Sequence, residues 1–384
     1  MMNNNCPTCG SKNTYLFLKR KNVPVHQNFP LTTQSSAENM TTGNLDLTIC
    51  QDCHFIFNRS FDDKRMKYNE NYNNDQLYSP SFRQYIDDSI GYLLSEHNIQ
   101  NSTILEVGCG KGDFIKELIS KGQGNKGIGF DPSYIGSEEM FDGRLKFIKD
   151  FFDSRYNTVQ AEVVICRHVI EHISNPLAFL ENLRKSLRHN RKAKVFFETP
   201  CVEWVLKNNV FWDFFYEHCS YFTTNSLSKV FELAGFKVER VKHIFHGQYL
   251  WLEASINEPK GNEAAESNLI ESVSQYIENE THLINTWQHK LQTLDNVAVW
   301  GAGAKGATFA NLLDPDRKFI NGIVDLNPNK QGRFIPGSGH QIINYTQLVE
   351  RKITSVIVMN PNYKDEISEL ISKLEWKIKL LGVE

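Results

Sequence analysis

Short apolar runs and amphipathic segments alternate along most of this chain. The apolar run 104–107 leads into a glycine-containing turn, and the apolar positions of 114–118 then recur at helical spacing. The alternation continues to about residue 256, where the runs 236–243 and 249–256 predict two paired final strands. This pattern is typical of a doubly wound, mostly parallel α/β sheet.

A second, shorter alternation begins at Asn296. Its predicted strands are 297–300, 320–325, 356–360 and 377–381, and its predicted helices are 307–313 and 365–374. A charged segment with proline and glycine, 258–267, precedes a long amphipathic helix that we predict from Leu269 to Trp287. The chain therefore carries two α/β units joined by a linker and a helix.

A length of 384 residues is too great for one ordinary core and indicates several domains. The expected parts are a cysteine-rich module (1–60), a helical connector with a helix at 86–96 (61–101), the larger α/β unit (102–258), the linker helix (259–294) and the smaller α/β unit (295–384).

The charge and hydropathy of the chain limit its partners. The formal net charge is −3, so nothing favours a nucleic acid or an anionic membrane as partner. No apolar run approaches the roughly 18 residues of a membrane span, and the N-terminus lacks the apolar core of a signal peptide. We expect a cytoplasmic enzyme that acts on a small molecule.

Four of the eight cysteines form two C-x₂-C pairs. A two-residue spacer lets both thiolates of a pair face one ion, and four sulfurs complete a tetrahedral zinc site. Such a site has no open position, so we predict a structural Zn²⁺ rather than a catalytic one. The predicted ligands are Cys6, Cys9, Cys50 and Cys53. The other four cysteines lie singly and are interpreted as small core residues.

The turn after the first strand of the larger unit is a candidate ligand site. A strand that ends in a glycine turn presents backbone N–H groups and a helix N-terminus to a ligand. The sequence is E-x-G-x-G-x-G, with Glu106, Gly108, Gly110 and Gly112, and it resembles motif I of class I S-adenosylmethionine (SAM) methyltransferases. In that family the turn receives the methionine end of SAM.

Further residues fall where such an enzyme holds SAM. Asp131 ends the next strand about 20 residues past the turn, where an acid grips a ribose diol. Asp150 and Phe151 resemble the pair that holds adenine, with the carboxylate on the exocyclic amine and the apolar residue over the ring. Arg167 and His168 follow a buried strand and belong to the same predicted rim.

The order of parts resembles the three-domain, zinc-binding sugar C-methyltransferases that act on nucleotide-linked 4-keto-6-deoxy sugars. Three segments carry the resemblance: W-G-A-G-A-K-G at 300–306, V-D-x-N-P-x-K-Q-G-x-x-x-P-G at 324–337 and E-H-x-x-Y-F at 217–222. It implies a class I SAM methyltransferase core with Rossmann-like topology, an N-terminal zinc module and a second, smaller Rossmann-like domain.

The resemblance also implies catalytic roles. C-methylation needs a base that removes a proton beside a ketone, and a histidine suits this. The family's base falls on His218, Glu217 would orient it, and His172 would face the same cleft. Tyr216 and Tyr221 are candidates to steady an enolate, because the family's tyrosine is replaced here by Phe215.

The smaller α/β unit has a G-x-G-x-x-G turn, and Asp325 stands where a ribose-binding acid would. An NAD site is therefore an alternative, although the unit is expected to supply only one mononucleotide half. The preferred interpretation is that Lys305 and the turn amides meet a phosphate-bearing substrate. Tyr72 and Tyr78, in a polar–aromatic segment, are further predicted substrate-binding residues.

Three functions remain open at this stage. The first is C-methylation of a nucleotide sugar or another phosphorylated biosynthetic intermediate. The second is O- or N-methylation in natural-product or polysaccharide assembly, since both chemistries can use a histidine base. The third is a non-catalytic SAM- or NAD-binding scaffold.

Overall fold

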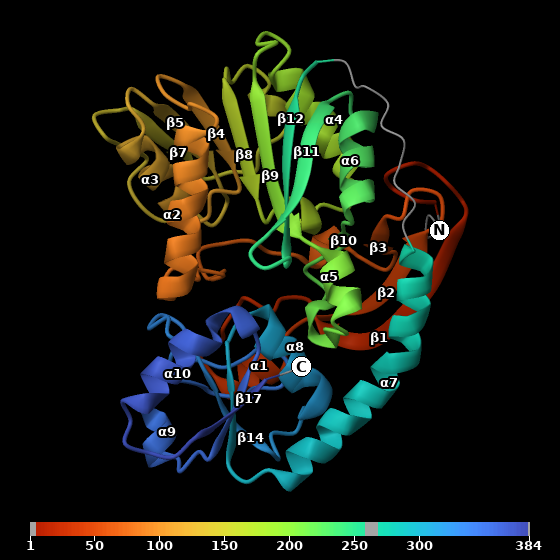
Figure 1. The fold of residues 1–384 in the computed structure, drawn as a ribbon, viewed down its shortest axis with the longest axis vertical. Coiled ribbons are helices and arrows are strands. Elements are labelled where there is room, and N and C mark those ends of the chain that lie inside the picture. The colour runs from red at the N-terminus through yellow and green to blue at the C-terminus, as the bar shows by residue number, and fades with distance from the viewer. Residues whose placement is uncertain (1–4, 258–267, 383–384) are drawn as a thin grey trace.

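A computed structural model describes residues 5–257 and 268–382 (Figure 1). The predicted linker 258–267 lies outside the described residues. The described chain forms three sheets, and the two α/β units lie one above the other with the N-terminal strands along one side. No helix of these described parts is long and apolar enough to cross a membrane.

The larger unit is built on an eight-stranded sheet of order β11-β12-β9-β8-β4-β5-β7-β6. Its parallel strands are β4 (Thr103–Val107), β5 (Lys126–Phe130), β7 (Leu145–Ile148), β8 (Val163–Arg167) and β9 (Lys194–Pro200). β12 (Tyr249–Ser255) runs antiparallel to β9, β11 (Lys237–Ile244) antiparallel to β12, and β6 (Glu139–Met140) antiparallel to β7. The predicted class I methyltransferase fold is confirmed.

Helices cover both faces of this sheet because neighbouring strand residues point to opposite sides. Ile104 packs with α2 (Pro80–Ser95) and α3 (Asp113–Lys121). Leu105 packs with α4 (Pro176–Ser186) and α6 (Thr224–Leu233) on the other face. α2 begins six residues before the predicted 86–96 helix, since the Ser79 hydroxyl caps it and Pro80 occupies its first turn.

The N-terminal module is a four-stranded antiparallel sheet that borrows its last strand from the larger unit. Its order is β1 (Thr14–Pro24), β2 (Thr42–Cys50), β3 (Ile56–Asn58) and β10 (Ser220–Tyr221), and α1 (Gln34–Glu38) lies between β1 and β2 in the chain. β10 begins two residues after His218, so the predicted catalytic segment is hydrogen-bonded to the module.

The smaller unit is a five-stranded, fully parallel sheet of order β15-β14-β13-β16-β17. Its strands are β13 (Val297–Trp300), β14 (Ile320–Val324), β15 (Ile342–Ile343), β16 (Ser355–Val358) and β17 (Lys379–Gly382), and its helices are α8 (Ala304–Leu313), α9 (Gln347–Glu350) and α10 (Lys364–Ser372). Strands lie on both sides of β13, so the expectation of a single mononucleotide half was wrong.

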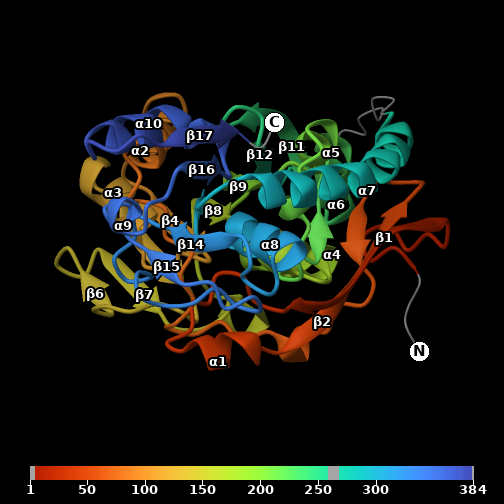
Figure 2. The same ribbon diagram turned by 90° about the horizontal axis from the view of Figure 1, so that it is seen from below.

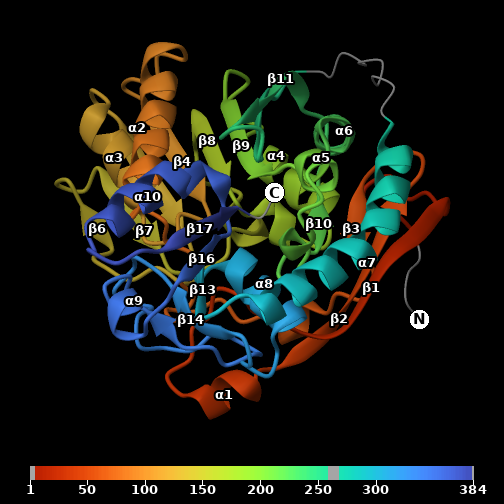
Figure 3. The ribbon, with the colours of Figure 1, turned by 60° about the horizontal axis from the view of Figure 1, so that its bottom comes forward.

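One apolar cluster joins all three parts. It contains Leu47 of β2, Tyr276 and Trp287 of α7 (Leu269–Thr293), and Phe309 of α8. α7 passes beside α5 (Val202–Lys207) and α8, as Figures 2 and 3 show. The predicted amphipathic helix therefore packs against elements of all three parts, namely β1, α5 and α8.

Arg20 of β1 is the polar centre of this junction. Its guanidinium donates to the Phe214 carbonyl (2.8 Å), to the Phe211 carbonyl (2.8 Å) and to Glu280 of α7 (2.5 Å). Arg20 is only 8% exposed, so water does not replace these bonds.

We predict that Arg20→Met lowers the free energy of unfolding by about 3–5 kcal/mol, because it leaves the Glu280 carboxylate without its buried partner. Chemical denaturation measures this. Lys19→Met, at the exposed neighbouring position of the same strand, is the control and should unfold like wild type. Equal midpoints for the two variants would contradict the assignment.

Candidate functional site

A cleft of about 250 Å³ lies between the larger and the smaller α/β unit. The larger unit contributes the loop after β8 and the segment 213–221, and the smaller unit contributes its glycine turn and the ends of β14 and β16. The carboxyl ends of parallel strands are where α/β sheets bind ligands. Both units therefore present their ligand-binding edges to one space.

His218 lies in the wall of this cleft. Its ring centroid is 4.2 Å from that of Phe215 and 4.9 Å from that of His172. Within residues 5–257 and 268–382 the imidazole makes no hydrogen bond. Burial lowers the pKa of His218 well below its ordinary value, and the neighbouring His172 adds to this. His218 is therefore a neutral imidazole with free nitrogens, as a general base requires.

Two polar contacts of its Nδ1 hold the His172 ring in place. Its Nδ1 lies 2.9 Å from the Glu217 carbonyl oxygen and 3.0 Å from the Tyr68 hydroxyl. A carbonyl only accepts, so Nδ1 carries a hydrogen that it donates to this oxygen. His172 and His218 thus form a pair of adjacent imidazole rings at the cleft.

Glu217 does not orient His218 in the way we predicted. Its carboxylate is fully buried and accepts from the Gln27 amide (2.5 Å), the Asn28 amide (3.1 Å) and the Tyr72 hydroxyl (3.1 Å). The carboxylate therefore binds residues from the N-terminal part of the chain, while His218 lines the cleft.

The two predicted catalytic tyrosines are also used otherwise. The Tyr216 hydroxyl accepts from the Asp62 amide (2.8 Å), and its ring covers Gly43, outside the cleft. Tyr221 lines the cleft, but its hydroxyl bridges the N–H and the carbonyl of Phe215 (3.1 and 3.0 Å). Neither phenol is free to steady an enolate.

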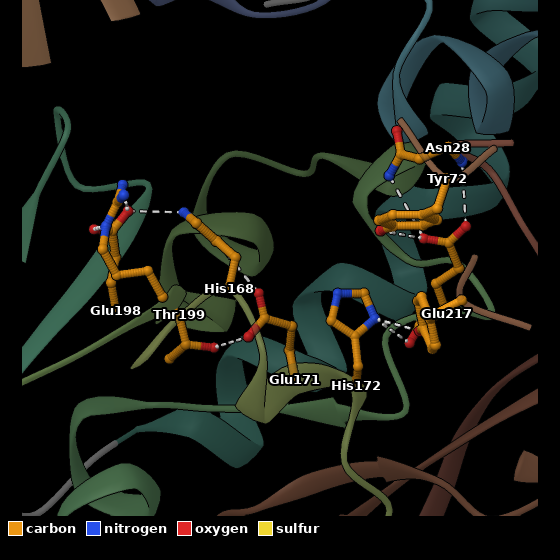
Figure 4. Close-up of polar contacts among 10 residues, drawn as sticks. Asn28, Tyr72, His168, Glu171, His172, Glu198, Thr199 and Glu217 are labelled. Atoms are coloured by element: carbon orange, nitrogen blue, oxygen red, sulfur yellow. Dashed lines mark hydrogen bonds and ion pairs between the residues drawn. The ribbon is translucent and has the colours of Figure 1, made fainter. Parts of the chain in front are cut away.

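A buried charge network runs along the rim beside His168 (Figure 4). The Nε2 of His168 lies 2.7 Å from Glu198, and its Nδ1 lies 3.3 Å from Glu171. The other oxygen of Glu171 accepts from Thr199 (3.0 Å). Burial alone would lower the pKa of His168, but the two carboxylates outweigh it and raise the pKa to about 9. His168 is therefore an imidazolium.

Arg167 completes that network. Its Nε donates to Glu198 (2.8 Å), and its guanidinium lies 4.3 Å from the centre of the Phe114 ring. Arg167 and His168 were predicted to hold SAM. In the structure both cations instead pair with the buried Glu198. A buried carboxylate without such partners would cost free energy of folding.

The three glycines of the first turn differ in their surroundings. All have positive φ, but a Cβ on Gly108 would lie 2.1 Å from Val169, and one on Gly112 would lie 2.5 Å from Phe147. A Cβ on Gly110 meets nothing within 4 Å. Gly108 and Gly112 therefore serve packing, and Gly110 alone faces open space that a ligand could fill.

Two acids adjoin this turn. Asp131 accepts from the Gly110 amide (2.8 Å) and from Ser133 (2.7 Å). Glu106 is buried, and its Oε2 has no hydrogen-bond partner among the described residues. Burial raises the pKa of Glu106 to about 8, although the positive charge of Arg167 acts to lower it. An unpaired buried carboxyl beside an open turn fits a ligand that brings a donor, such as the ammonium group of SAM.

The predicted adenine pair lies further along the edge. Asp150 accepts from the Tyr156 hydroxyl (2.8 Å) and pairs with Arg155 (2.9 Å). Phe151 is 56% exposed and so leaves an apolar face uncovered. Any contact of Asp150 with adenine would have to share the carboxylate with these partners.

The predicted substrate residues line the cleft but are not free. The Lys305 ammonium lies 2.6 Å from Asp213, so its charge is already compensated. Tyr72 donates to Glu217 (3.1 Å), and the Tyr78 hydroxyl accepts from Asn329 (3.3 Å). An anion at Lys305 would have to displace or share Asp213.

At the glycine turn of the smaller unit, too, the available space and polar groups are already occupied by the protein itself. A Cβ on Gly306 would lie 2.0 Å from the Gly301 carbonyl oxygen, so that glycine is required by the turn itself. Asp325 accepts from the Ala302 amide (3.1 Å) and pairs with the buried Lys330 (3.3 Å). The acid that an NAD ribose would need is thus already engaged.

The residues that the structure describes contain three groups of potential metal ligands. They are Cys6, Cys9, Cys50 and Cys53; Glu171, His172 and His218; and Cys201, Glu203 and His243. In the first group two Sγ–Sγ distances are 3.6 Å, as expected of thiolates around one ion. In the second, both Glu171 oxygens already contact His168 and Thr199, so this group favours base chemistry over metal binding.

Comparison with known proteins assigns the domains. Residues 81–241 match the family model of a methyltransferase domain, and residues 263–381 match that of a C-methyltransferase C-terminal domain. The chain therefore has the domains of a SAM-dependent methyltransferase.

Curated relatives match about a quarter of the chain. A ubiquinone biosynthesis O-methyltransferase of Rickettsia typhi is 30% identical over 111 residues, which is 28% of this chain and 44% of the relative. One from Rickettsia bellii is 30% identical over 96 residues, 24% of this chain and 40% of the relative. The chain thus spans less than half the length of these relatives.

Solved structures resemble somewhat less than half of the chain. A methyltransferase of calicheamicin biosynthesis in its SAH-bound form has a TM-score of 0.36 at 16% identity, covering 46% of this chain and 56% of that one. The Synechocystis magnesium protoporphyrin IX methyltransferase with bound SAM has a TM-score of 0.33 at 16% identity, covering 46% and 80%.

Sequence reasoning missed several residues of the methyltransferase cleft. Tyr68 and Asn28 are distant from the motifs, and only packing brings them to the site. Glu171 stands three residues after His168 and could have been noticed from the sequence. The pairing of Glu198 with His168 depends on the parallel register of β8 and β9.

We predict that Asp131→Ala weakens SAM binding by about 1–3 kcal/mol, the loss expected for charge-assisted hydrogen bonds. Asp131→Asn keeps an acceptor for the Gly110 amide and should lose less. Isothermal titration calorimetry measures both. Asp316→Ala, at an exposed position of the smaller unit, is the control. Wild-type affinity in Asp131→Ala would remove this acid from the SAM site.

Proposed function

We propose that this protein transfers a methyl group from SAM to a carbon atom of a polar acceptor, with His218 as the general base. The observation that carries the proposal is the neutral, unpaired His218 in a cleft shared by the methyltransferase domain and the C-terminal domain. An acceptor bound by both domains would have its reacting atom beside this histidine.

The residues suit deprotonation at carbon. SAM, when bound, supplies an electrophilic methyl group. The His218 imidazole takes the proton beside a ketone and becomes an imidazolium, which leaves a nucleophilic carbon. His172, 4.9 Å away between ring centroids, is positioned to share or pass on that proton.

The acceptor class follows from the second domain. The match of residues 263–381 to a C-methyltransferase C-terminal domain supports a carbon acceptor. The cleft offers the side-chain amides of Gln76 and Asn360 beside aromatic walls, a mixture suited to a sugar with an attached ring. We therefore propose a nucleotide-linked keto sugar or a related phosphorylated intermediate.

The second candidate is O-methylation. The curated relatives are named O-methyltransferases, and a histidine base serves a hydroxyl as well. The two chemistries differ in one observable: removal of a carbon-bound proton precedes C-methylation only.

We also propose that the four cysteines hold a structural Zn²⁺. The turns at the two C-x₂-C pairs have the same local form. The Gly10 amide donates to the Cys6 carbonyl and the His54 amide donates to the Cys50 carbonyl (2.9 Å each). Gly10 and His54 each have a positive φ. Two matching turns that bring four sulfurs within 4.8 Å of one another fit a tetrahedral, closed site.

We predict that the purified protein retains one equivalent of zinc per chain. Cys50→Ser should lose it and melt at a lower temperature, because metal binding adds to folding stability. Elemental analysis and thermal unfolding are the measurements. Cys166→Ser, at an equally buried core thiol, should keep its zinc, and metal-free wild-type protein would refute the proposal.

We predict that His218→Ala lowers turnover by about 10²–10⁴-fold, the contribution of a general base, while SAM affinity is unchanged. A screen of nucleotide sugars with SAM, read by mass spectrometry for one added methyl, provides the assay. His246→Ala, at an exposed histidine near the end of β11, is the control. Full activity of His218→Ala would move the base to His172.

Two further readouts belong to this experiment. Because the pKa of His218 is lowered, it stays neutral in mild acid, and the acid limb of the rate profile should lie below pH 6.5, its ordinary value. With a carbon acceptor the wild-type enzyme should exchange the acceptor's α-proton with deuterated solvent, and His218→Ala should not. Methylation without any exchange would favour an oxygen acceptor.

A further inference from the structure

The third group of potential ligands lies behind one wall of the cleft. Cys201 precedes α5, Glu203 lies in its first turn, and His243 belongs to β11. Cys201 is fully buried, whereas His243 is exposed. The group therefore reaches from the interior to the surface.

The ligand atoms face one another at metal-site spacing. The Cys201 Sγ is 3.6 Å from the His243 Nδ1 and 3.7 Å from the Glu203 Oε2. Zinc bonds of about 2.3 Å to sulfur and 2.0 Å to nitrogen or oxygen, at tetrahedral angles, separate such ligand atoms by roughly 3.5 Å. Small shifts of the side chains would suffice to admit an ion.

A fourth side chain sets the histidine tautomer. The Thr224 amide and hydroxyl both donate to Glu203 Oε2 (3.0 and 3.1 Å), and the hydroxyl lies 3.4 Å from the His243 Nε2. Since its one hydrogen is used, its oxygen accepts from Nε2–H, and the lone pair of Nδ1 then points at the thiol. Metal-bound histidines characteristically have the second ring nitrogen hydrogen-bonded in this way.

We propose that Cys201, Glu203 and His243 form a second metal site, for Zn²⁺ or a similar borderline-soft divalent ion. The Cys201 thiol loses its proton to solvent on binding, and the sulfur, the His243 Nδ1 and a Glu203 oxygen become ligands. Water takes the fourth position on the exposed His243 side. With three protein ligands this site binds more weakly than the four-cysteine site.

A metal ion at this site would act on the wall of the cleft. The Cys201 amide donates to the Gln248 carbonyl (2.9 Å), and both neighbours of Cys201, Pro200 and Val202, line the cleft. A metal ion would tie the start of α5 to β11. It would therefore stiffen the wall on which the acceptor rests, independently of whether the acceptor is methylated at carbon or oxygen.

The test uses the full chain with its tightly held zinc in place. After a brief wash with chelator, Zn²⁺ is titrated in without SAM or acceptor, in competition with a chromophoric chelator. Wild-type protein should bind one further equivalent. His243→Ala should weaken that equivalent at least about tenfold, and Thr224→Ala about tenfold, as expected for loss of a ligand and of an outer-shell partner.

Two variants complete the design. His289→Ala, at an exposed histidine of α7, should bind like wild type. Cobalt, used as a spectroscopic probe, should give thiolate-to-metal absorption that Cys201→Ser lacks; if that variant fails to fold, the surface variant His243→Ala still decides. No further equivalent in wild type, or unchanged affinity in His243→Ala, would reduce the group to a thiol–imidazole hydrogen bond and overturn the proposal.

Discussion

The architecture of the catalytic region depends on the burial of one carboxylate. Glu217 has no exposed surface, and its charge is balanced by the backbone amides of Gln27 and Asn28, by Tyr72 and by the nearby His26. Burial alone would raise the pKa of Glu217, but these partners outweigh it and lower the pKa. A buried charge without partners is costly, so the N-terminal module and the segment that carries His218 must be docked together for either to be stable.

Packing on several sides also fixes the segment 211–222. Its aromatic residues contact different parts of the molecule: Phe211 and Trp212 pack against α8, and Phe214 packs against β1 and α7. His218 lines the cleft from this segment. Packing on several sides holds a catalytic group in one position without using the group's own hydrogen bonds.

The two glycine turns show how similar motifs can serve different ends. In both, some glycines exist because backbone or side chains leave no room for a Cβ. In both, the acid after the next strand accepts from an amide of the turn, Asp131 from Gly110 and Asp325 from Ala302. The first turn also has open space at Gly110 and a Glu106 oxygen without a hydrogen-bond partner among the described residues, whereas Lys330 pairs with Asp325 at the second. A motif of glycines and one acid therefore predicts a turn, and the residues packed around it decide whether a ligand has room there.

The sequence by itself determined both α/β units, the long helix and the four-cysteine group, because periodicity of two or 3.6 and a C-x₂-C spacing are local properties. It did not determine which side chains face the cleft. Glu217, Tyr216, Arg167 and Lys305 were all predicted to act on ligands, yet each is engaged by residues from elsewhere in the chain: Gln27, Asp62, Glu198 and Asp213. Those partners are brought together only by packing, and packing decided which polar groups remained free.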